Sequence, residues 1–272
     1  KNIVLLDRYN VKINEPVFDT QIAGYLTDYN VEDDIATMGR IFGYDLNDHD
    51  DDFGTIKRPI EVSIDKLKEI TSTKSKFIYE TKEELLNKIS EYEENDLFNN
   101  IEMPLLADME ITGIRVDKEY LEDLKSDLEK KLDVLEKEIY EISGVEFNIS
   151  SPAQLSDVLF NTLQIPYPKR VKNNKYSTSK DILDKIKDFN PIVEKVLEYR
   201  TISKLYSNYA TGLLNEIRED GRIHTIYTQT LTRTGRLSSI SPNLQNIPAR
   251  DDYGRLVKKA FIPFENSKLL SS

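Results

Sequence analysis

The sequence predicts a mixed α+β protein with a long antiparallel helical arm and a short antiparallel sheet. Residues 117–143 and 190–217 repeat apolar side chains at helical spacing, which predicts two long helices. Residues 222–232 are instead rich in β-branched and aromatic side chains, which are typical of strands. The 272 residues are enough for one large domain or two smaller ones.

Residues 1–100 are expected to form a mixed α/β region. VFDTQIAGYL (17–26) predicts a strand end that runs into a helix, and residues 64–70 and 82–92 have helical spacing. DLNDHDDDFG (45–54) gathers five aspartates around His49. Because like charges packed together usually stay in water, we interpret this stretch as a solvated acidic loop rather than a metal site.

The arm is predicted from two apolar stripes. After a helix end, a turn at Gly113 and a short strand, Asp117 is expected to be the N-cap of the first long helix. Asn190 followed by Pro191 is a typical start for the second. Since neither helix can bury its stripe alone, we expect them to pack against each other. The stripe residues are Leu121, Leu124, Leu128, Leu132, Leu135, Ile139 and Ile142 in the first helix, and Ile192, Val196, Tyr199, Ile202, Tyr206, Tyr209, Leu213 and Ile217 in the second.

The residues between the two long helices are the predicted tip of the arm. Ser151 and Gln154 fit a capping box, and Thr178 with Asp181 marks another helix start. Residues 165–180 carry five basic side chains and no acidic one. A solvated basic loop and a grip on phosphate groups both stay open, and the acidity of the other residues favours the grip. The five basic residues are Lys169, Arg170, Lys172, Lys175 and Lys180.

Residues 219–272 are expected to form the antiparallel sheet. Asp220–Gly221 predicts a turn before the strand at 222–232. AFIPF (260–264) and KLLSS (268–272) predict two further strands around an Asn266–Ser267 turn. The sheet would be incomplete at the last residue.

Between these strands lies TRTGRLSSISPNLQNIPAR (232–250), which we name the donor-rich stretch. It holds three arginines and three side-chain amides, with Leu237, Leu244 and Ile247 as apolar anchors. Such donors suit the minor groove of DNA, where every correct base pair presents the same acceptors. On spacing alone, a structural loop whose arginines cap carbonyl groups is an equal alternative. Three basic residues that follow are candidates for phosphate contacts: Arg255, Lys258 and Lys259.

Composition excludes several classes of protein. The net charge of −11 is uneven, at −10 over residues 1–100, −9 over 101–164 and +8 over 165–272, so phosphate contact is expected in the last of these ranges. The absence of cysteine excludes a disulfide framework and a thiolate zinc site. With no long apolar run and no signal-peptide pattern, we expect a cytoplasmic protein without a membrane partner.

Ordered motifs over essentially the whole chain resemble the bacterial family A DNA polymerases. The most specific is TGRLSSISPNLQNIPAR in the donor-rich stretch. The others are VFDTQIAGYL, MEITGIRVD, FNISSPAQL, YSTSKDIL, IVEKVLEYR, ISKLYSNY, HTIYTQTLTRTGRLSS and KAFIPF. The resemblance implies a partial 3′–5′ exonuclease-like domain of ribonuclease H-like α/β fold at 1–113, a helical thumb at 114–218 with the basic tip at 165–180, and the start of the palm at 219–272.

The resemblance also implies a function. Family A polymerases extend a primer 3′-hydroxyl by template-directed nucleotidyl transfer in replication and repair, with Mg²⁺ held by palm aspartates. The expected partners are a primer–template duplex and deoxynucleoside triphosphates, in a monomeric protein at the bacterial nucleoid. The first palm aspartate would follow KLLSS, so we expect no catalytic residue and no bound Mg²⁺ within this chain. Alone, the chain is expected not to polymerise DNA.

DNA contacts are implied residue by residue. Arg236 matches the arginine that donates to the minor-groove side of the primer-terminal pair, and Arg250 matches one near the nucleotide and template. The other minor-groove residues are Gln229, Thr234, Asn243, Gln245 and Asn246. Contacts to the DNA backbone are expected from Lys169, Arg170, Lys172, Lys175, Ser177, Thr178, Lys204 and Arg233. His224 is expected to be structural.

The implied exonuclease is expected to be an inactive remnant. Asp19 matches one of its metal ligands, but the last acidic position, expected just after Tyr79, has Glu83 as its nearest match. Two alternatives to the polymerase function stay open, a stand-alone non-catalytic DNA-binding module and a residual 3′–5′ exonuclease.

Overall fold

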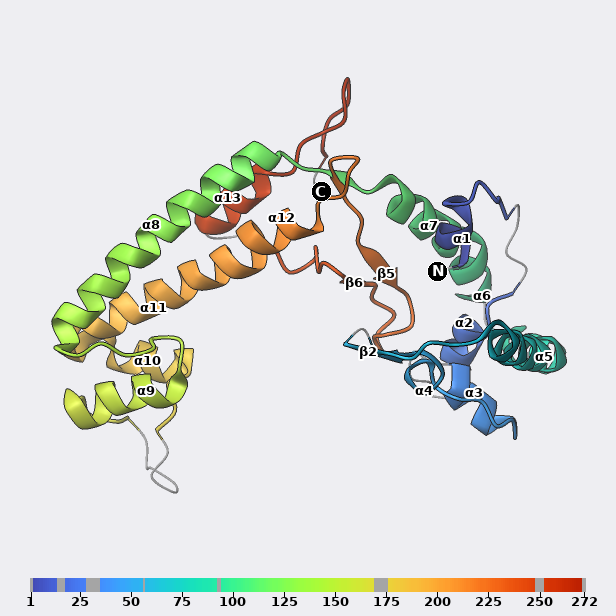
Figure 1. Ribbon diagram of the computed structural model, residues 1–272, viewed down its shortest axis with the longest axis horizontal. Coiled ribbons are helices and arrows are strands. Elements are labelled where there is room, and N and C mark those ends of the chain that lie inside the picture. The colour runs from blue at the N-terminus through green and yellow to red at the C-terminus, as the bar shows by residue number, and fades with distance from the viewer. Residues whose placement is uncertain are drawn as a thin grey trace. The chain divides into compact units, whose positions relative to one another are not determined.

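The computed structural model describes residues 2–13, 18–27, 35–55, 57–91, 94–168, 176–247 and 252–270. It confirms the mixed α+β class, since helices dominate and the described strands form short antiparallel pairs (Figure 1). The chain divides into two compact units. Unit 1 comprises residues 1–113 and 224–245, and unit 2 comprises residues 114–223 and 246–272. The residues predicted as a third domain are therefore shared between the units, and the identity of each domain stays a prediction.

Unit 1 is built around one long helix. This helix, α5 (Ile64–Ile89), is continuous across the two segments predicted as helical and begins at Ser63, whose hydroxyl accepts a hydrogen bond from the Lys66 backbone N–H. Phe77 and Leu85 on its inner face are fully buried in a core that includes Ala23 of α2. The other elements of unit 1 are α1 (Asn2–Asp7), α2 (Thr20–Leu26), α3 (Ile35–Ile41), α4 (His49–Phe53), β1 (Gly54–Thr55), β2 (Arg58–Pro59), α6 (Glu94–Asp96), the π-helical η1 (Leu97–Glu102), α7 (Met103–Thr112), β5 (Ile226–Thr228) and β6 (Ser238–Ile240).

The aspartate-rich stretch is not the solvated loop that the sequence predicted. His49–Phe53 form α4, and Gly54 follows with a φ of 72°, where a side chain would also lie 2.2 Å from the Arg58 carbonyl oxygen. Asp52 is buried, with its Oδ2 at 2.8 Å from Lys74 Nζ and its Oδ1 accepting from Asn47 at 3.1 Å. Asp52 can be buried because the Lys74 ammonium group and the Asn47 amide donate hydrogen bonds to its carboxylate.

The Asp52–Lys74 pair is expected to make unit 1 sensitive to acid. Burial by itself raises the pKa of Asp52, but hydrogen bonds from Lys74 and Asn47 outweigh burial and hold the pKa below its ordinary value. The stabilisation is present above the pKa of an unfolded aspartate and is lost as pH falls through the lower folded value. We expect Asp52→Asn to reduce the fall in unfolding free energy between about pH 5 and about pH 3, measured by urea denaturation.

Lys74→Met tests the same pair from its other side. This substitution leaves the buried Asp52 carboxylate without its ion-pair partner. We expect the unfolding free energy to fall by about 2 kcal/mol. The value is smaller than for a fully buried pair because the Lys74 side chain is 22% exposed. Asp50→Asn and Lys76→Met are matched controls, since both side chains are more than two-thirds exposed. Equal effects in the controls and the test variants would contradict a role for the pair.

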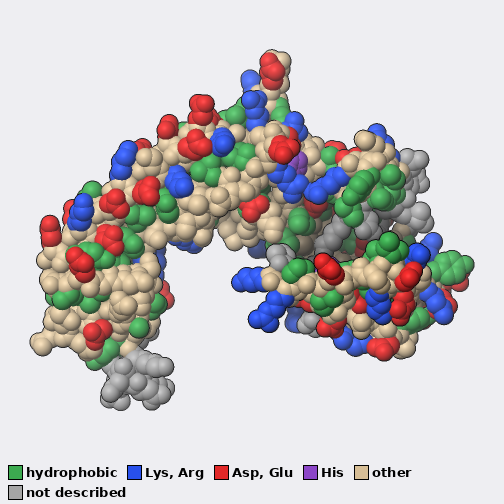
Figure 2. Space-filling model, viewed as in Figure 1, with side chains coloured by type: hydrophobic (Ala, Val, Ile, Leu, Met, Phe, Trp, Pro, Cys, Tyr) green, Lys and Arg blue, Asp and Glu red, His purple; other side chains and the backbone are tan. Residues whose placement is uncertain are grey.

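Unit 2 contains the predicted helical arm. Its two long helices are α8 (Lys118–Ser143) and α11 (Pro191–Lys204), which lie side by side, and α11 continues through the π-helical η4 (Leu205–Thr211) into α12 (Gly212–Glu216) (Figure 1). Both predicted caps are confirmed, because Asp117 accepts from the Tyr120 N–H at 3.0 Å and Asn190 from the Ile192 N–H at 3.0 Å. Acidic and basic side chains alternate over the outer face of the arm (Figure 2). Most of the two apolar stripes is buried.

The tip of the arm consists of α9 (Pro152–Ser156), the π-helical η2 (Asp157–Thr162), α10 (Lys180–Ile186) and the 3₁₀ turn η3 (Lys187–Phe189). Ser151 accepts from the Gln154 N–H at 3.4 Å as predicted, but the Gln154 side chain accepts from the Asn148 N–H at 2.7 Å, not from Ser151. Only the serine half of the capping box is therefore formed, and the glutamine side chain bonds to the turn that precedes the helix. Lys169, Arg170, Lys172 and Lys175 lie outside the described residues.

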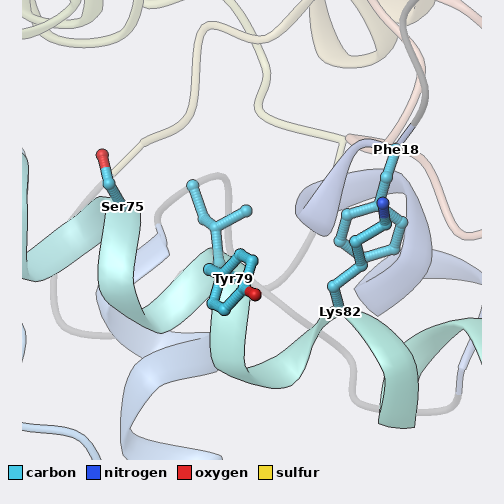
Figure 3. Close-up of a pocket in the computed structure, with 5 residues that line it drawn as sticks. Phe18, Ser75, Tyr79 and Lys82 are labelled. Atoms are coloured by element: carbon cyan, nitrogen blue, oxygen red, sulfur yellow. The ribbon is translucent and has the colours of Figure 1, made fainter.

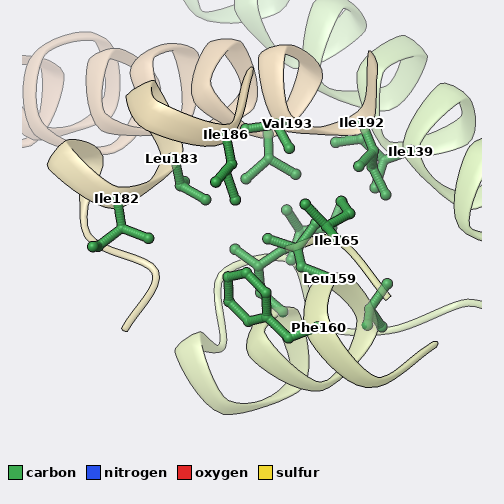
Figure 4. Close-up of a cluster of buried hydrophobic side chains, with 13 residues drawn as sticks. Ile139, Leu159, Phe160, Ile165, Ile182, Leu183, Ile186, Ile192 and Val193 are labelled. Atoms are coloured by element: carbon green, nitrogen blue, oxygen red, sulfur yellow. The ribbon is translucent and has the colours of Figure 1, made fainter. Parts of the chain in front are cut away.

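A core of buried apolar side chains joins the tip to the arm. Leu159, Leu183 and Val193 are fully buried and point toward one another from η2, α10 and α11 (Figure 4). Beside them, the rings of Phe160, Tyr167 and Tyr176 pack in a mutual cluster with centroids 4.9 to 5.1 Å apart. This cluster brings together the chain on the two sides of the basic segment.

The predicted strands of residues 219–272 are partly wrong. Residues 222–232 form two strands with different partners, because β4 (Arg222–Ile223) pairs with β3 (Ile114–Arg115) and β5 pairs with β6. Around Asn266–Ser267 the predicted turn is present, but AFIPF contributes only a single bridge from Phe261 to Val116. The described part of KLLSS forms no strand, and Leu270 is 94% exposed. A helix that the sequence did not predict, α13 (Asp252–Lys259), packs in unit 2.

Candidate nucleic-acid interface

Buried hydroxyl groups anchor the middle of the donor-rich stretch. Thr225 Oγ1 lies 2.7 Å from Ser239 Oγ, 3.0 Å from the Ile240 carbonyl oxygen and 2.8 Å from the Pro242 carbonyl oxygen. Ser239 is 0% exposed, and its hydroxyl also accepts from the Leu244 N–H at 3.1 Å. These bonds fix residues 238–244 where the sequence offers little apolar periodicity. The sequence did not predict this network, because the residues around a hydroxyl-bearing side chain do not indicate which distant group it will bond to.

A second set of bonds fixes residues 232–236, which we name the arginine turn. Tyr25 of α2 donates its hydroxyl to the Thr232 carbonyl oxygen at 2.8 Å and accepts from the Gly235 N–H at 3.0 Å. The Thr232 hydroxyl donates to the Arg236 carbonyl oxygen at 2.6 Å. Gly235 has a φ of 72°, which favours glycine. The backbone of the turn is thus held from three points.

The side chains of the arginine turn face solvent. Arg233, Thr234 and Arg236 are all exposed. Among the described residues, neither arginine side chain has a hydrogen-bond or ion-pair partner, so the alternative in which these arginines cap carbonyl groups is not observed for them. Two guanidinium groups on a fixed backbone are available for a partner.

The three side-chain amides of the stretch are also exposed. In unit 1, Asn243 Oδ1 accepts from the Gln245 N–H at 3.0 Å, which closes a local turn. In unit 2, the carbonyl oxygen of Asn246 accepts from the hydroxyl of the buried Tyr209. The Gln245 side chain faces solvent, whereas its backbone N–H is held by the local turn and the carbonyl oxygen of Asn246 is held by Tyr209. Arg250 lies outside the described residues.

Three predicted site residues have partners within the chain instead. Gln229 Nε2 donates to the Phe98 carbonyl oxygen at 3.2 Å and to Glu102 at 2.9 Å. Thr178 is 5% exposed, and its hydroxyl accepts from Arg200, a guanidinium whose pKa is lowered by burial. Asp19 caps α2 by accepting from two backbone N–H groups. These contacts give the three side chains structural roles within the chain, and their predicted contacts with DNA or metal stay predictions.

Other predicted residues are exposed or structural as expected. Lys204 on α11 and Ser177 at the tip are exposed, and Ser177 Oγ accepts from the Ser179 N–H at 3.2 Å. His224 Nδ1 lies 2.7 Å from the Glu110 carbonyl oxygen, which fits its predicted structural role. The basic residues of α13 are all exposed: Arg255, Lys258 and Lys259.

The described residues offer no fit to a metal ion. Nowhere in the described ranges do three His, Asp or Glu side chains gather in a way that could hold one. Asp19 matches a metal ligand of the implied exonuclease, and its Oδ1 accepts from the Gln21 and Ile22 N–H groups at 2.9 and 3.0 Å. We assign no metal-dependent step to these residues.

A pocket of about 330 Å³ lies elsewhere in unit 1. Its lining residues are Phe18 and, from α5, Ser75, Ile78, Tyr79 and Lys82 (Figure 3). Its described lining residues include none of the predicted site residues and no carboxylate. Within the described ranges, no helix is long and apolar enough to cross a membrane.

Comparison with known protein families gives independent evidence of the family to which the chain is related. Residues 118–272 match the model of DNA polymerase family A. Over 276 residues the chain is 42% identical to DNA polymerase I of Lactococcus lactis subsp. cremoris, covering 100% of the chain and 31% of the relative. It is 44% identical to DNA polymerase I of Streptococcus pneumoniae serotype 4, covering 99% of the chain and 31% of the relative. The chain thus spans about a third of the length of these relatives.

A solved structure is similar in fold. It is the POL domain of Pol1 from M. smegmatis in complex with DNA primer–template and dNTP. The superposition has a TM-score of 0.79 at 28% sequence identity, and it covers 94% of this chain and 43% of the other.

Proposed function

The chain belongs to DNA polymerase family A, and from this premise we propose that it is the part of a DNA-directed DNA polymerase that grips the primer–template duplex and reads its minor groove. The observation that carries the proposal is the arginine turn, whose exposed Arg233, Thr234 and Arg236 side chains stand on a fixed backbone. The whole protein would extend primers in bacterial replication and repair, as a cytoplasmic monomer that takes deoxynucleoside triphosphates.

The chemistry of the minor groove suits such a turn. Every correct base pair presents a purine N3 and a pyrimidine O2 acceptor there, at nearly constant positions. A guanidinium with a planar set of donors bonds to such acceptors only when they lie where the donors point. A mismatched pair displaces the acceptors, so Arg236 would respond to pair geometry and not to sequence.

The remaining parts of the proposal follow the family. Residues 1–113 would be a non-catalytic exonuclease-like domain, residues 114–218 the thumb, and residues 219–272 the start of the palm. Mg²⁺ ions that assist nucleotidyl transfer would be held by residues outside this chain. Within the chain, Asn243, Gln245 and Asn246 would extend the donor surface, and the exposed lysines would contact phosphates.

Binding of this chain to a primer–template duplex is expected to weaken steeply with salt. Each phosphate neutralised by a lysine or arginine releases counterions, and about three such contacts correspond to a loss of affinity of about 40-fold between about 50 and about 200 mM salt. Fluorescence anisotropy of a labelled duplex measures the slope. An affinity independent of salt would contradict the phosphate contacts.

Substitution of single lysines tests which side chains contribute to the salt slope. Lys204→Ala is expected to reduce the salt slope by about one, whereas Lys130→Ala, which removes an exposed lysine of α8 near Asp127, is the matched control and should leave it unchanged. An extension assay with the full-length protein and magnesium separates the polymerase function from that of a stand-alone DNA-binding module. Extension supports the polymerase, and salt-dependent binding without extension supports a non-catalytic DNA-binding module.

A further inference from the structure

Tyr25 connects two segments that are more than 200 residues apart in the chain. Its phenolic oxygen donates to the Thr232 carbonyl oxygen and accepts from the Gly235 N–H, at 2.8 and 3.0 Å. A single atom thus bonds to both ends of the Thr232–Gly235 segment of the arginine turn. A phenylalanine at this position would make neither bond, although its ring would fill the same space.

The protein holds Tyr25 itself in place. Tyr25 lies in α2, whose first turn is capped by Asp19, and its ring packs against Phe98 with centroids 5.8 Å apart. Phe98 is 7% exposed, and its carbonyl oxygen accepts from the Gln229 side chain just before the turn. The hydroxyl is therefore presented to the turn by packed elements, α2 and η1.

We propose that Tyr25 is a positioning residue for Arg236 in primer extension, an inference that rests on the proposed function. Among the described residues, one other side-chain bond to the backbone of the turn is found, from Thr232 to the Arg236 carbonyl oxygen, and both of its groups belong to the turn. Tyr25 supplies the fixed point outside the turn. By this inference α2 contributes to DNA synthesis without contacting DNA.

The effect of Tyr25 should appear in rate more than in affinity. Duplex affinity is dominated by phosphate contacts, which do not depend on the exact place of one donor. A hydrogen bond to the primer-terminal pair does depend on it, because misplacement by about 1 Å can cost about 100-fold in rate. Loss of the hydroxyl loosens the turn without removing Arg236, so a smaller effect of about 10-fold is expected.

The test uses the full-length polymerase that contains this chain. Tyr25→Phe, Arg236→Ala and the double variant are compared in single-turnover primer extension, with duplex affinity measured alongside. Tyr44→Phe is the matched control, since Tyr44 is a half-buried tyrosine of unit 1 whose hydroxyl donates to Glu80 at 2.6 Å. Hydrogen–deuterium exchange of the peptide that spans residues 232–236 reports directly on the Gly235 N–H.

We expect Tyr25→Phe to slow extension about 10-fold with duplex affinity within about twofold, to speed exchange in the 232–236 peptide, and to add almost nothing to Arg236→Ala. Tyr44→Phe should do none of these. Effects of Tyr25→Phe and Arg236→Ala that multiply, or an unchanged rate in an active parent protein, would overturn this inference alone. A parent protein that binds duplex but extends no primer would overturn the proposed function, and this inference with it.

Discussion

In the full-length protein, Arg236→Ala is expected to slow extension of a matched primer about 100-fold, while duplex affinity falls less than about threefold. Arg236 stands exposed on a turn whose backbone is bonded to Tyr25 and Thr232, so the point from which its guanidinium projects is fixed before any DNA binds. A pre-positioned donor acts mainly on the rate, because its bond matters most when the primer end must be aligned for reaction. Single-turnover extension and anisotropy measure the two quantities.

The same variant should also lose discrimination at the primer end. If Arg236 tests pair geometry, its removal slows extension of matched ends more than of mismatched ends, and the ratio of the two rates falls. Arg236→Lys should not restore the ratio, because an ammonium lacks the planar set of donors. Arg40→Ala, an exposed arginine of α3, is the control. Equal losses in rate and affinity would place Arg236 on phosphate and not at the primer terminus.

The helical arm could be predicted from the sequence because its signals are local. Asp117 and Asn190 cap helices through side chains that bond two or three residues ahead, so the neighbouring sequence is sufficient to identify them. Its apolar stripes were recognisable for the same reason, since residues on one helix face recur at a fixed spacing. Leu121 and Ile139 are fully buried at the positions that this spacing predicted.

The features that position the candidate site could not be predicted, because they depend on distant partners. Nothing around Tyr25 in the sequence indicates that it bonds to residues 232 and 235, and Asp52 resembles the four exposed or half-buried aspartates near it until Lys74 is placed beside it. The prediction of one continuous strand at 222–232 was wrong, because two strands form there and the chain changes partners at His224 and Thr225, where side-chain bonds to Glu110 and Ser239 replace the ladder.

Leu159→Ala is expected to destabilise unit 2 by about 3 kcal/mol, which is typical of a fully buried leucine cut to alanine where the surroundings cannot collapse. Leu159 is 0% exposed and sits in a core to which η2, α10 and α11 all contribute (Figure 4). Ile139 of α8 reaches the same core, so no single helix can move to fill the cavity. Urea denaturation, followed by circular dichroism of the largely helical arm, measures the change.

Val134→Ala is the matched control for this prediction, because Val134 lies on α8 with 56% of its surface exposed, and its loss should cost less than about 0.5 kcal/mol. A cost for Leu159→Ala near that of the control would mean that the tip core is loosely packed.

The same variant tests whether the tip core affects duplex binding. At urea concentrations below its unfolding transition, the folded Leu159→Ala variant keeps every exposed lysine and arginine of the chain. Its salt slope for duplex binding should therefore equal that of the unaltered chain, whereas a reduced slope would show that the tip core sets the geometry of the phosphate contacts.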